Sequence, residues 1–141
     1  MYKNVISHQS FHNFLDELKE LNLPKGKYAI FGSGPIAIRG LRDAHDLDVI
    51  VKNSVYQDLC NRYSKNVVLS PVNCIQLNNL EITNIWLNSR EKINEMIDTA
   101  ETIQGFPFVR LKYLLKYKKQ MGRKKDLEDI KLVKKYLKNS K

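Results

Sequence analysis

The sequence predicts an α+β fold, in which a mixed sheet is flanked by helices and two basic helices follow at the C-terminal end. Short apolar runs of strand length, separated by turn residues, predict the sheet. Amphipathic patterns with helical spacing near both ends of the chain predict the flanking helices. A chain of 141 residues with 43% hydrophobic content is expected to form a single domain, 1–141, around one core.

The first part of the chain predicts two strands between helices. Apolar residues at helical spacing predict an amphipathic helix over residues 10–21, with Ser10 as its N-cap. A short apolar run predicts a strand at 28–31. A short helix is expected from Pro35 onward, because proline fits the first helical turn. The continuous apolar run that follows two acids predicts a buried strand over 46–51.

The remaining elements are predicted from the same periodicities and from turn residues. In chain order, they are a helix over 53–63 capped by Asn53 or Ser54, strands at 67–69 and 74–77 around a turn at Ser70 and Pro71, a strand at 80–87, a helix from Ser89 to residue 97, an extended piece at 102–104, a helix over 106–121, and a last helix from 124 or 125 to 137.

The positive charge of the chain is concentrated at its C-terminal end. The net charge is +9, and residues 110–141 hold 13 Lys or Arg against three acids, whereas the rest of the chain is nearly balanced. Such a basic segment attracts polyanions, including triphosphates and RNA. The alternative is a lysine-rich terminal helix that is simply solvated.

The sequence also predicts a cytoplasmic protein without membrane attachment. No apolar run approaches the length that crosses a membrane, and the first residues lack a continuous apolar signal segment. Cys60 and Cys74 lack the spacing of a metal site and are expected to be reduced thiols.

Candidate functional residues lie in the stretch 28–51. Gly32 and Ser33 follow the first predicted strand, where a glycine turn allows close approach of the backbone to a phosphate. Asp46 and Asp48 open the second strand, and strand alternation places them on the same face. Two adjacent carboxylates repel each other and favour a divalent cation with oxygen ligands. The alternative is a pair of exposed acids at the end of a strand.

Glu81 is the third candidate carboxylate. It stands between Leu80 and Ile82 in an apolar strand, where an unpaired acid is costly to bury. If this strand lies beside the strand at 46–51, the three carboxylates converge and can hold two divalent ions. An exposed strand position or a salt bridge would also explain the residue.

A dinucleotide-binding turn is the main rival interpretation of the glycines. Gly32, Gly34 and Ala37 fit the G-x-G-x-x-A pattern of that turn. However, the helix after the turn has room for only two turns, and the acids stand at the front of the second strand rather than at its end. Both features disfavour a dinucleotide site.

The Gly-Ser turn, the D-L-D sequence at the head of a strand and an acid on a later strand together resemble the DNA polymerase beta-like nucleotidyltransferase superfamily. In that superfamily the Gly-Ser turn binds the triphosphate of the substrate, and three carboxylates bind two magnesium ions. The resemblance therefore implies phosphate binding by Gly32 and Ser33, and catalysis and metal binding by Asp46, Asp48 and Glu81.

The C-terminal segment adds a second resemblance. Residues 118–130 read KKQMGRKKDLEDI and resemble the K-x-x-x-G-R-x-K-D-x-x-D segment of small nucleotidyltransferases related to the abortive-infection type IV (AbiEii-like) toxins. The resemblance implies that Lys118, Arg123 and Asp126 bind the nucleotide and that the downstream acid of the motif completes the site. Lys125 and Asp129 also match the motif. Lys118 shares a helical face with several leucines and Met121, so it needs an anionic partner such as phosphate or Asp126.

These features predict a metal-dependent nucleotidyltransferase that moves a nucleoside monophosphate from a nucleoside triphosphate to an acceptor hydroxyl, with two Mg²⁺ ions. The basic helices favour RNA, such as a tRNA end, over a neutral small molecule as the acceptor, and a protein acceptor is a further option. The resemblance implies a role as a toxin or in phage defence, with a cognate toxin–antitoxin partner. The alternatives are a non-catalytic nucleotide- or RNA-binding module and an antitoxin-like partner.

Overall fold

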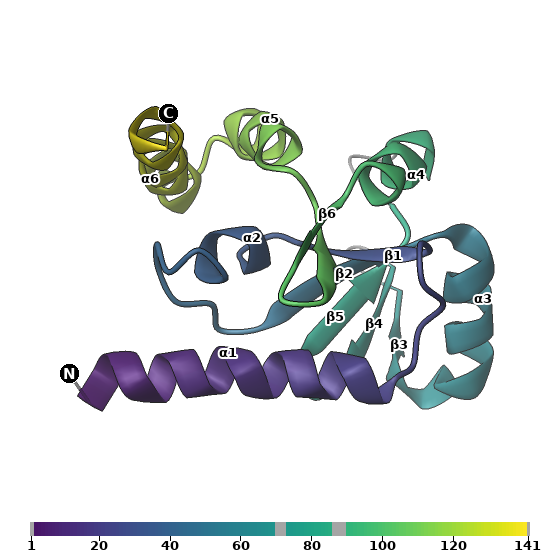
Figure 1. Ribbon diagram of the computed structural model, residues 1–141. Coiled ribbons are helices and arrows are strands. Elements are labelled where there is room, and N and C mark those ends of the chain that lie inside the picture. The colour runs from purple at the N-terminus through teal and green to yellow at the C-terminus, as the bar shows by residue number, and fades with distance from the viewer. Residues whose placement is uncertain (1, 70–72, 86–89, 141) are drawn as a thin grey trace.

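The computed structural model describes residues 2–69, 73–85 and 90–140 (Figure 1). The turn expected at Ser70 and Pro71 and the helix cap expected at Ser89 lie outside these residues. The strand expected to reach residue 87 ends at Thr83, and positions 86–87 also lie outside the described residues.

A seven-stranded mixed sheet forms the centre of the fold, in the order β3-β4-β5-β2-β1-β7-β6. The β1–β7 and β2–β5 pairs are parallel, and the other neighbours are antiparallel. The α+β prediction is therefore confirmed. The strands are β1 (Tyr28–Phe31), β2 (Leu47–Val51), β3 (Val67–Val68), β4 (Cys74–Leu77), β5 (Leu80–Thr83), β6 (Glu101–Ile103) and β7 (Phe106–Phe108).

The antiparallel pairing of β1 with β2 excludes the dinucleotide-binding interpretation of the glycine turn. That fold requires two consecutive parallel strands joined by a helical crossover. Here the chain turns back on itself between β1 and β2, and the intervening helix α2 (Gly34–Ala37) has only four residues. The turn and the head of β2 consequently lie at the same end of the sheet.

Helices cover both faces of the sheet and divide the core into two clusters (Figure 1). Side chains of α1 and α3 pack with Ile30, Leu47 and Val49 on one face. Side chains of α4, α5 and α6 pack with Phe31 and Ile50 on the other face. In addition to α2, the described helices are α1 (Tyr2–Glu20), α3 (Asn53–Arg62), α4 (Arg90–Asp98), α5 (Leu111–Met121) and α6 (Lys124–Asn139), with a 3₁₀ turn η1 (Ser64–Asn66).

Two helix starts differ from the sequence prediction. Helix α1 begins at Tyr2, so Ser10 lies inside the helix and is not its cap. Helix α3 has Lys52 at its N-cap position, and Asn53 is its first helical residue. The Asn53 side-chain oxygen instead accepts a hydrogen bond from the buried Asn84 side chain (2.9 Å). A long-range contact thus replaces the local cap.

The helix predicted over 106–121 is wrong in its first part. Its first three residues form β7, which pairs with β6 as a hairpin, and α5 begins at Leu111. Gln104 and Gly105 connect the two strands with φ of 52° and 85°. Positive φ at both positions is typical of the two-residue turn that joins paired strands. The hairpin places β7 beside β1, and the Val109 N–H donates to the Ile30 carbonyl (2.9 Å).

Within the described part of the chain, no helix combines the length and the apolar character that crossing a membrane requires.

Candidate active site

Three carboxylates meet at the end of the sheet where β2 begins. Asp48 on β2 is the register partner of Glu81 on the parallel strand β5, and Asp46 directly precedes β2. One potential ligand atom from each of the three lies within 4.8 Å of the other two. The condition on which the sequence prediction depended, that the two strands be neighbours, is met. These residues are called the acidic cluster below.

Strand alternation explains why the acids are on this face. Leu47 and Val49 point into the core beneath α1 and are fully buried. Asp48, between them, points to the opposite face, which α4, α5 and α6 cover. The parallel β2–β5 pairing then brings Glu81 to the same face and the same level.

The glycine turn, residues 32–34, lies directly against the acidic cluster. Gly32 has φ of 62°, a left-handed conformation that glycine adopts without steric cost. A Cβ at this position would overlap with the Asp48 carboxylate. Glycine is therefore required twice, for backbone conformation and for space. Ser33 follows immediately and is half-exposed.

The acidic cluster is electrostatically strained. Burial, followed by the negative charges of Asp46 and Glu81, raises the pKa of Asp48 to about 7. The positive charges of Lys118 and Lys125 act in the opposite direction and only partly offset this. A cation bound by these oxygens would relieve the repulsion, and hard carboxylate oxygens are the ligands that Mg²⁺ prefers.

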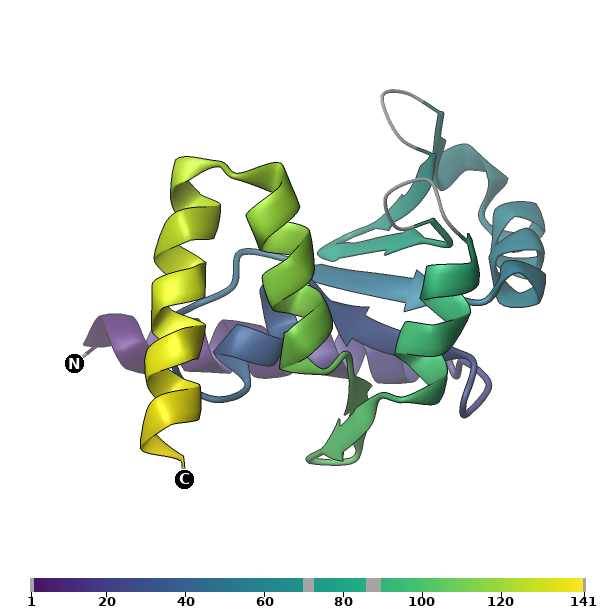
Figure 2. The ribbon, with the colours of Figure 1, turned by 90° about the horizontal axis from the view of Figure 1, so that it is seen from above.

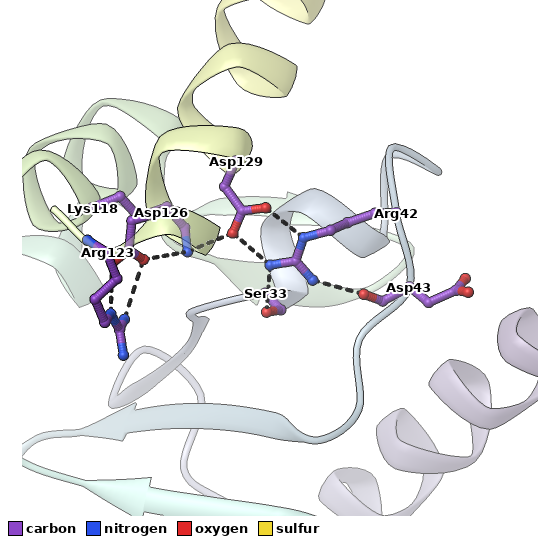
Figure 3. Close-up of polar contacts among 7 residues, drawn as sticks. All are labelled: Ser33, Arg42, Asp43, Lys118, Arg123, Asp126 and Asp129. Carbon is purple, nitrogen blue, oxygen red and sulfur yellow. Dashed lines mark hydrogen bonds and ion pairs between the residues drawn. The ribbon is translucent and has the colours of Figure 1, made fainter. Parts of the chain in front are cut away.

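Arg42 connects the glycine turn to helix α6 (Figure 3). Its Nε and one terminal nitrogen donate to the two carboxylate oxygens of Asp129, at 2.6 Å each. The same terminal nitrogen donates to the Ser33 Oγ (2.9 Å), and the other donates to the Asp43 carbonyl (2.7 Å). Asp129 is 3% exposed, so it is a buried carboxylate with a well-ordered set of partners.

Lys118 is the second cation of this buried ion network. Its Nζ lies 2.8 Å from Asp129 Oδ2 and 3.6 Å from Asp126 Oδ1, and the residue is 5% exposed. The prediction that Lys118 faces inward and needs an anionic partner is confirmed. Met121, which was expected on the same inward face, is exposed instead. Nucleotide binding by Lys118 stays a prediction.

Arg123 and Asp126 organise the start of α6. The Arg123 Nε donates to Asp126 Oδ2 (2.6 Å), and the Arg123 backbone N–H donates to the same oxygen (3.1 Å). Asp126 therefore satisfies a free N–H group at the helix start, as in a capping box. The structure thus places Asp126 within the chain's own contacts, and its predicted role toward the nucleotide remains untested.

Cations lower the pKa of both acids of the network. Burial alone would raise the pKa of Asp126, but hydrogen bonds from Arg123 and the charge of Lys118 outweigh it. Burial likewise opposes ionisation of Asp129, and the contacts from Arg42 and Lys118 outweigh it and lower the pKa of Asp129. Both carboxylates are therefore ionised at neutral pH.

From the sequence, Arg42 is either a contact for a phosphate or an RNA acceptor or a solvated arginine, and its pairing with Asp129 is not predicted. The two residues are 87 positions apart, so no local spacing joins them. The available signal was indirect: Asp129 lies one helical turn after Asp126, on the same face of an amphipathic helix.

Comparison of the chain with protein-family models gives no match, and comparisons with curated proteins and with solved structures give none either. Function must therefore be inferred from the site itself.

Proposed function

We propose that the chain is a metal-dependent nucleotidyltransferase, which transfers a nucleoside monophosphate from a nucleoside triphosphate to an acceptor hydroxyl and releases pyrophosphate. The observation that carries the proposal is the direct contact between the glycine turn and a cluster of three carboxylates. A phosphate-binding turn beside a divalent-metal site is the arrangement that phosphoryl transfer requires.

Each element of the site has a role in this reaction. Asp46, Asp48 and Glu81 would hold the magnesium ions, which neutralise the triphosphate and activate the acceptor hydroxyl. The glycine turn would offer its backbone N–H groups to a phosphate, and the hydroxyl of Ser33 would donate to it. Catalysis then comes mainly from positioning and charge neutralisation, so no separate general base is needed.

The acceptor in this proposal is an RNA, such as a tRNA end, in preference to a protein. Helices α5 and α6 lie side by side and antiparallel (Figure 2), and their outer surface is strongly basic. A positive surface next to the site would hold a nucleic acid through its phosphates. The exposed basic residues of this surface are Lys112, Lys116, Lys119, Arg123, Lys124, Lys125, Lys131, Lys134, Lys135 and Lys138.

A toxin or phage-defence role with a cognate antitoxin, and a cytoplasmic location, complete the proposal. The toxin or phage-defence role rests on the resemblance of the sequence motifs alone. The competing possibility is a module with the same fold that binds nucleotide or RNA without catalysis.

Label transfer tests the proposal. The protein is incubated with each α-labelled nucleoside triphosphate, Mg²⁺ and total tRNA or cell lysate. The expected result is label in one macromolecular band, because the α-phosphate stays with the acceptor. The double variant Asp46→Asn/Asp48→Asn is expected to lose transfer, while Asp58→Asn, an exposed acid on α3, is expected to retain it.

The outcome that contradicts the proposal is a folded wild-type protein that transfers no label with any triphosphate. In that case, triphosphate binding is measured by calorimetry. Binding that depends on Mg²⁺ and is lost in Asp48→Ala would favour an enzyme whose acceptor is a small molecule missing from the assay, and triphosphate binding without this dependence would favour a nucleotide-binding module. RNA binding that needs only the lysines of α5 and α6 would favour an RNA-binding module.

A further inference from the structure

The Ser33 hydroxyl has a fixed hydrogen-bond direction. A guanidinium group has only donors, so the Ser33 Oγ must accept the hydrogen bond from Arg42 (2.9 Å). A hydroxyl that accepts in this way keeps its own hydrogen available for another acceptor. Ser33 is half-exposed at the glycine turn, so that acceptor can be an anionic oxygen of a ligand.

Arg42 itself is held rigidly. All three of its guanidinium nitrogens have partners: Nε and one terminal nitrogen bind Asp129, and the other binds the Asp43 carbonyl. Asp129 in turn receives Lys118 at 2.8 Å. The planar fork of arginine matches this set of acceptors, and the single ammonium of lysine does not.

The charge of Arg42 is already used within the protein. Its bidentate partner Asp129 is 3% exposed, pairs with it at close range and also pairs with Lys118. Arg42 is thus better suited to orient a neighbour than to attract a phosphate by its own charge. The neighbour that it orients is Ser33.

We propose that Arg42 is a positioning residue, which Asp129 holds in place and which fixes the Ser33 hydroxyl as a hydrogen-bond donor to a ligand phosphate. This inference rests on the proposed function, because it assumes that the glycine turn binds phosphate. It also gives α6 a defined task, since Asp129 belongs to that helix.

The test is a double-variant cycle on binding of inorganic tripolyphosphate with Mg²⁺, measured by calorimetry on the full chain. Ser33→Ala is expected to weaken binding about tenfold, the value of one hydrogen bond to a charged group. Arg42→Lys is expected to weaken it nearly as much. The double variant is expected to bind no more weakly than Ser33→Ala, because Arg42 acts through Ser33.

Arg39→Lys is the matched control. Arg39 lies in the same loop and binds Glu101 (2.8 Å) and the ring of Tyr136 on α6. The variant removes an arginine contact with the Tyr136 ring of α6 and leaves the Arg42–Ser33 hydrogen bond in place. Its tripolyphosphate affinity is therefore expected to stay within about twofold of wild type.

Three results would overturn the inference: equal effects of Arg42→Lys and Arg39→Lys, full additivity of Arg42→Lys and Ser33→Ala, or no tripolyphosphate binding by folded wild-type protein. The label-transfer assay judges the proposed function separately. If label is transferred but the effects of Arg42→Lys and Ser33→Ala on tripolyphosphate binding are independent, only the inference is overturned. If the two effects are coupled but no label is transferred, only the proposed function is overturned.

Discussion

At the scale of single residues, Asp48 shows a conflict between stability and chemistry. A leucine or valine at a half-buried strand position would add to the core, whereas Asp48 brings a charge beside two further carboxylates. Residues that weaken the fold in this way are typical of functional sites. The effect of Asp48 on the free energy of unfolding can be measured without knowing the substrate.

Asp48→Asn is expected to stabilise the metal-free protein at pH 8. The pKa of Asp48 is raised from 3.8 to about 7 in the folded chain, so the folded state binds a proton that the unfolded state releases. The free energy of unfolding of the wild type therefore falls as the pH rises from about 4 to about 7. Above pH 7, the variant should be more stable by an amount on the order of 1–4 kcal/mol.

Denaturant titrations at pH 5 and pH 8 in the presence of a chelator measure this difference. Asp58→Asn, on the exposed side of α3, serves as the control and should show little change. A stabilisation that is absent at pH 8, or larger at pH 5 than at pH 8, would contradict the account of the acidic cluster.

Gly32→Ala is expected to reduce stability and to disrupt the acidic cluster. The added Cβ would overlap with the Asp48 carboxylate, and the φ of 62° is itself unfavourable for alanine. Gly26→Ala is a matched control, because Gly26 has φ of 82° but open space around its Cβ position. The control should lose about 1–2 kcal/mol from the backbone alone, and Gly32→Ala should lose more. Equal losses in thermal unfolding would rule out the predicted overlap.

At the scale of secondary-structure elements, a buried ion network joins α5 and α6 to the glycine turn. Lys118 on α5 reaches Asp126 and Asp129 on α6, and Arg42 extends the contact to Ser33. Removing one partner from a buried ion network leaves an uncompensated charge, which costs more than the pair itself contributes.

Lys118→Met is therefore expected to destabilise the protein by about 3 kcal/mol. Methionine keeps the length and the apolar part of the lysine side chain, so the loss reports on the charge. Lys116→Met, an exposed position on the same helix, should change stability little. The measurement is chemical denaturation at pH 7. Similar stabilities of the two variants would show that the network is not important for the packing of α5 against α6.

The elements also show how far the sequence predicts the structure. The strand alternation at Asp46 and Asp48 was sufficient to place two acids on one face, because that relation is local. The position of Glu81 depended on whether β5 lies beside β2, which is a non-local property. The pairing of Arg42 with Asp129 was not predictable from spacing for the same reason.

The sequence prediction missed β7 and its hairpin pairing with β6, whereas the extended piece expected at 102–104 corresponds to β6. Phe106 and Phe108 precede the apolar face of α5, so their spacing was compatible with an extension of that helix. The turn residues Gln104 and Gly105 were the better signal, because a glycine in a two-residue connection favours a hairpin. Tertiary pairing of β7 with β1 then fixes the extended conformation.

At the scale of the whole molecule, the charge is strongly asymmetric. The net excess of positive charge belongs to residues 110–141, which include α5 and α6. The acidic cluster, in contrast, gathers negative charge at the end of the sheet. An anionic ligand that bridges a bound metal and the basic helices would suit this distribution.

Reversing the charge of Lys134, Lys135 and Lys138 on α6 is expected to weaken RNA binding and to make it less dependent on salt. Each lost phosphate contact reduces the slope of log affinity against log salt by about one. Fluorescence anisotropy with labelled tRNA at several salt concentrations measures both effects. The same reversal at the exposed Lys19, Lys25 and Lys65 is the control. Equal losses in the two triple variants would indicate that α6 is no specific RNA surface.

The most direct test of the central claim, that the glycine turn and the acidic cluster form one site, is anomalous diffraction from crystals grown with Mn²⁺ and a non-hydrolysable nucleoside triphosphate. The expected result is manganese density among Asp46, Asp48 and Glu81, with the triphosphate against Gly32 and Ser33. Metal or triphosphate bound at a different place on the protein, with the acidic cluster empty, would contradict the account.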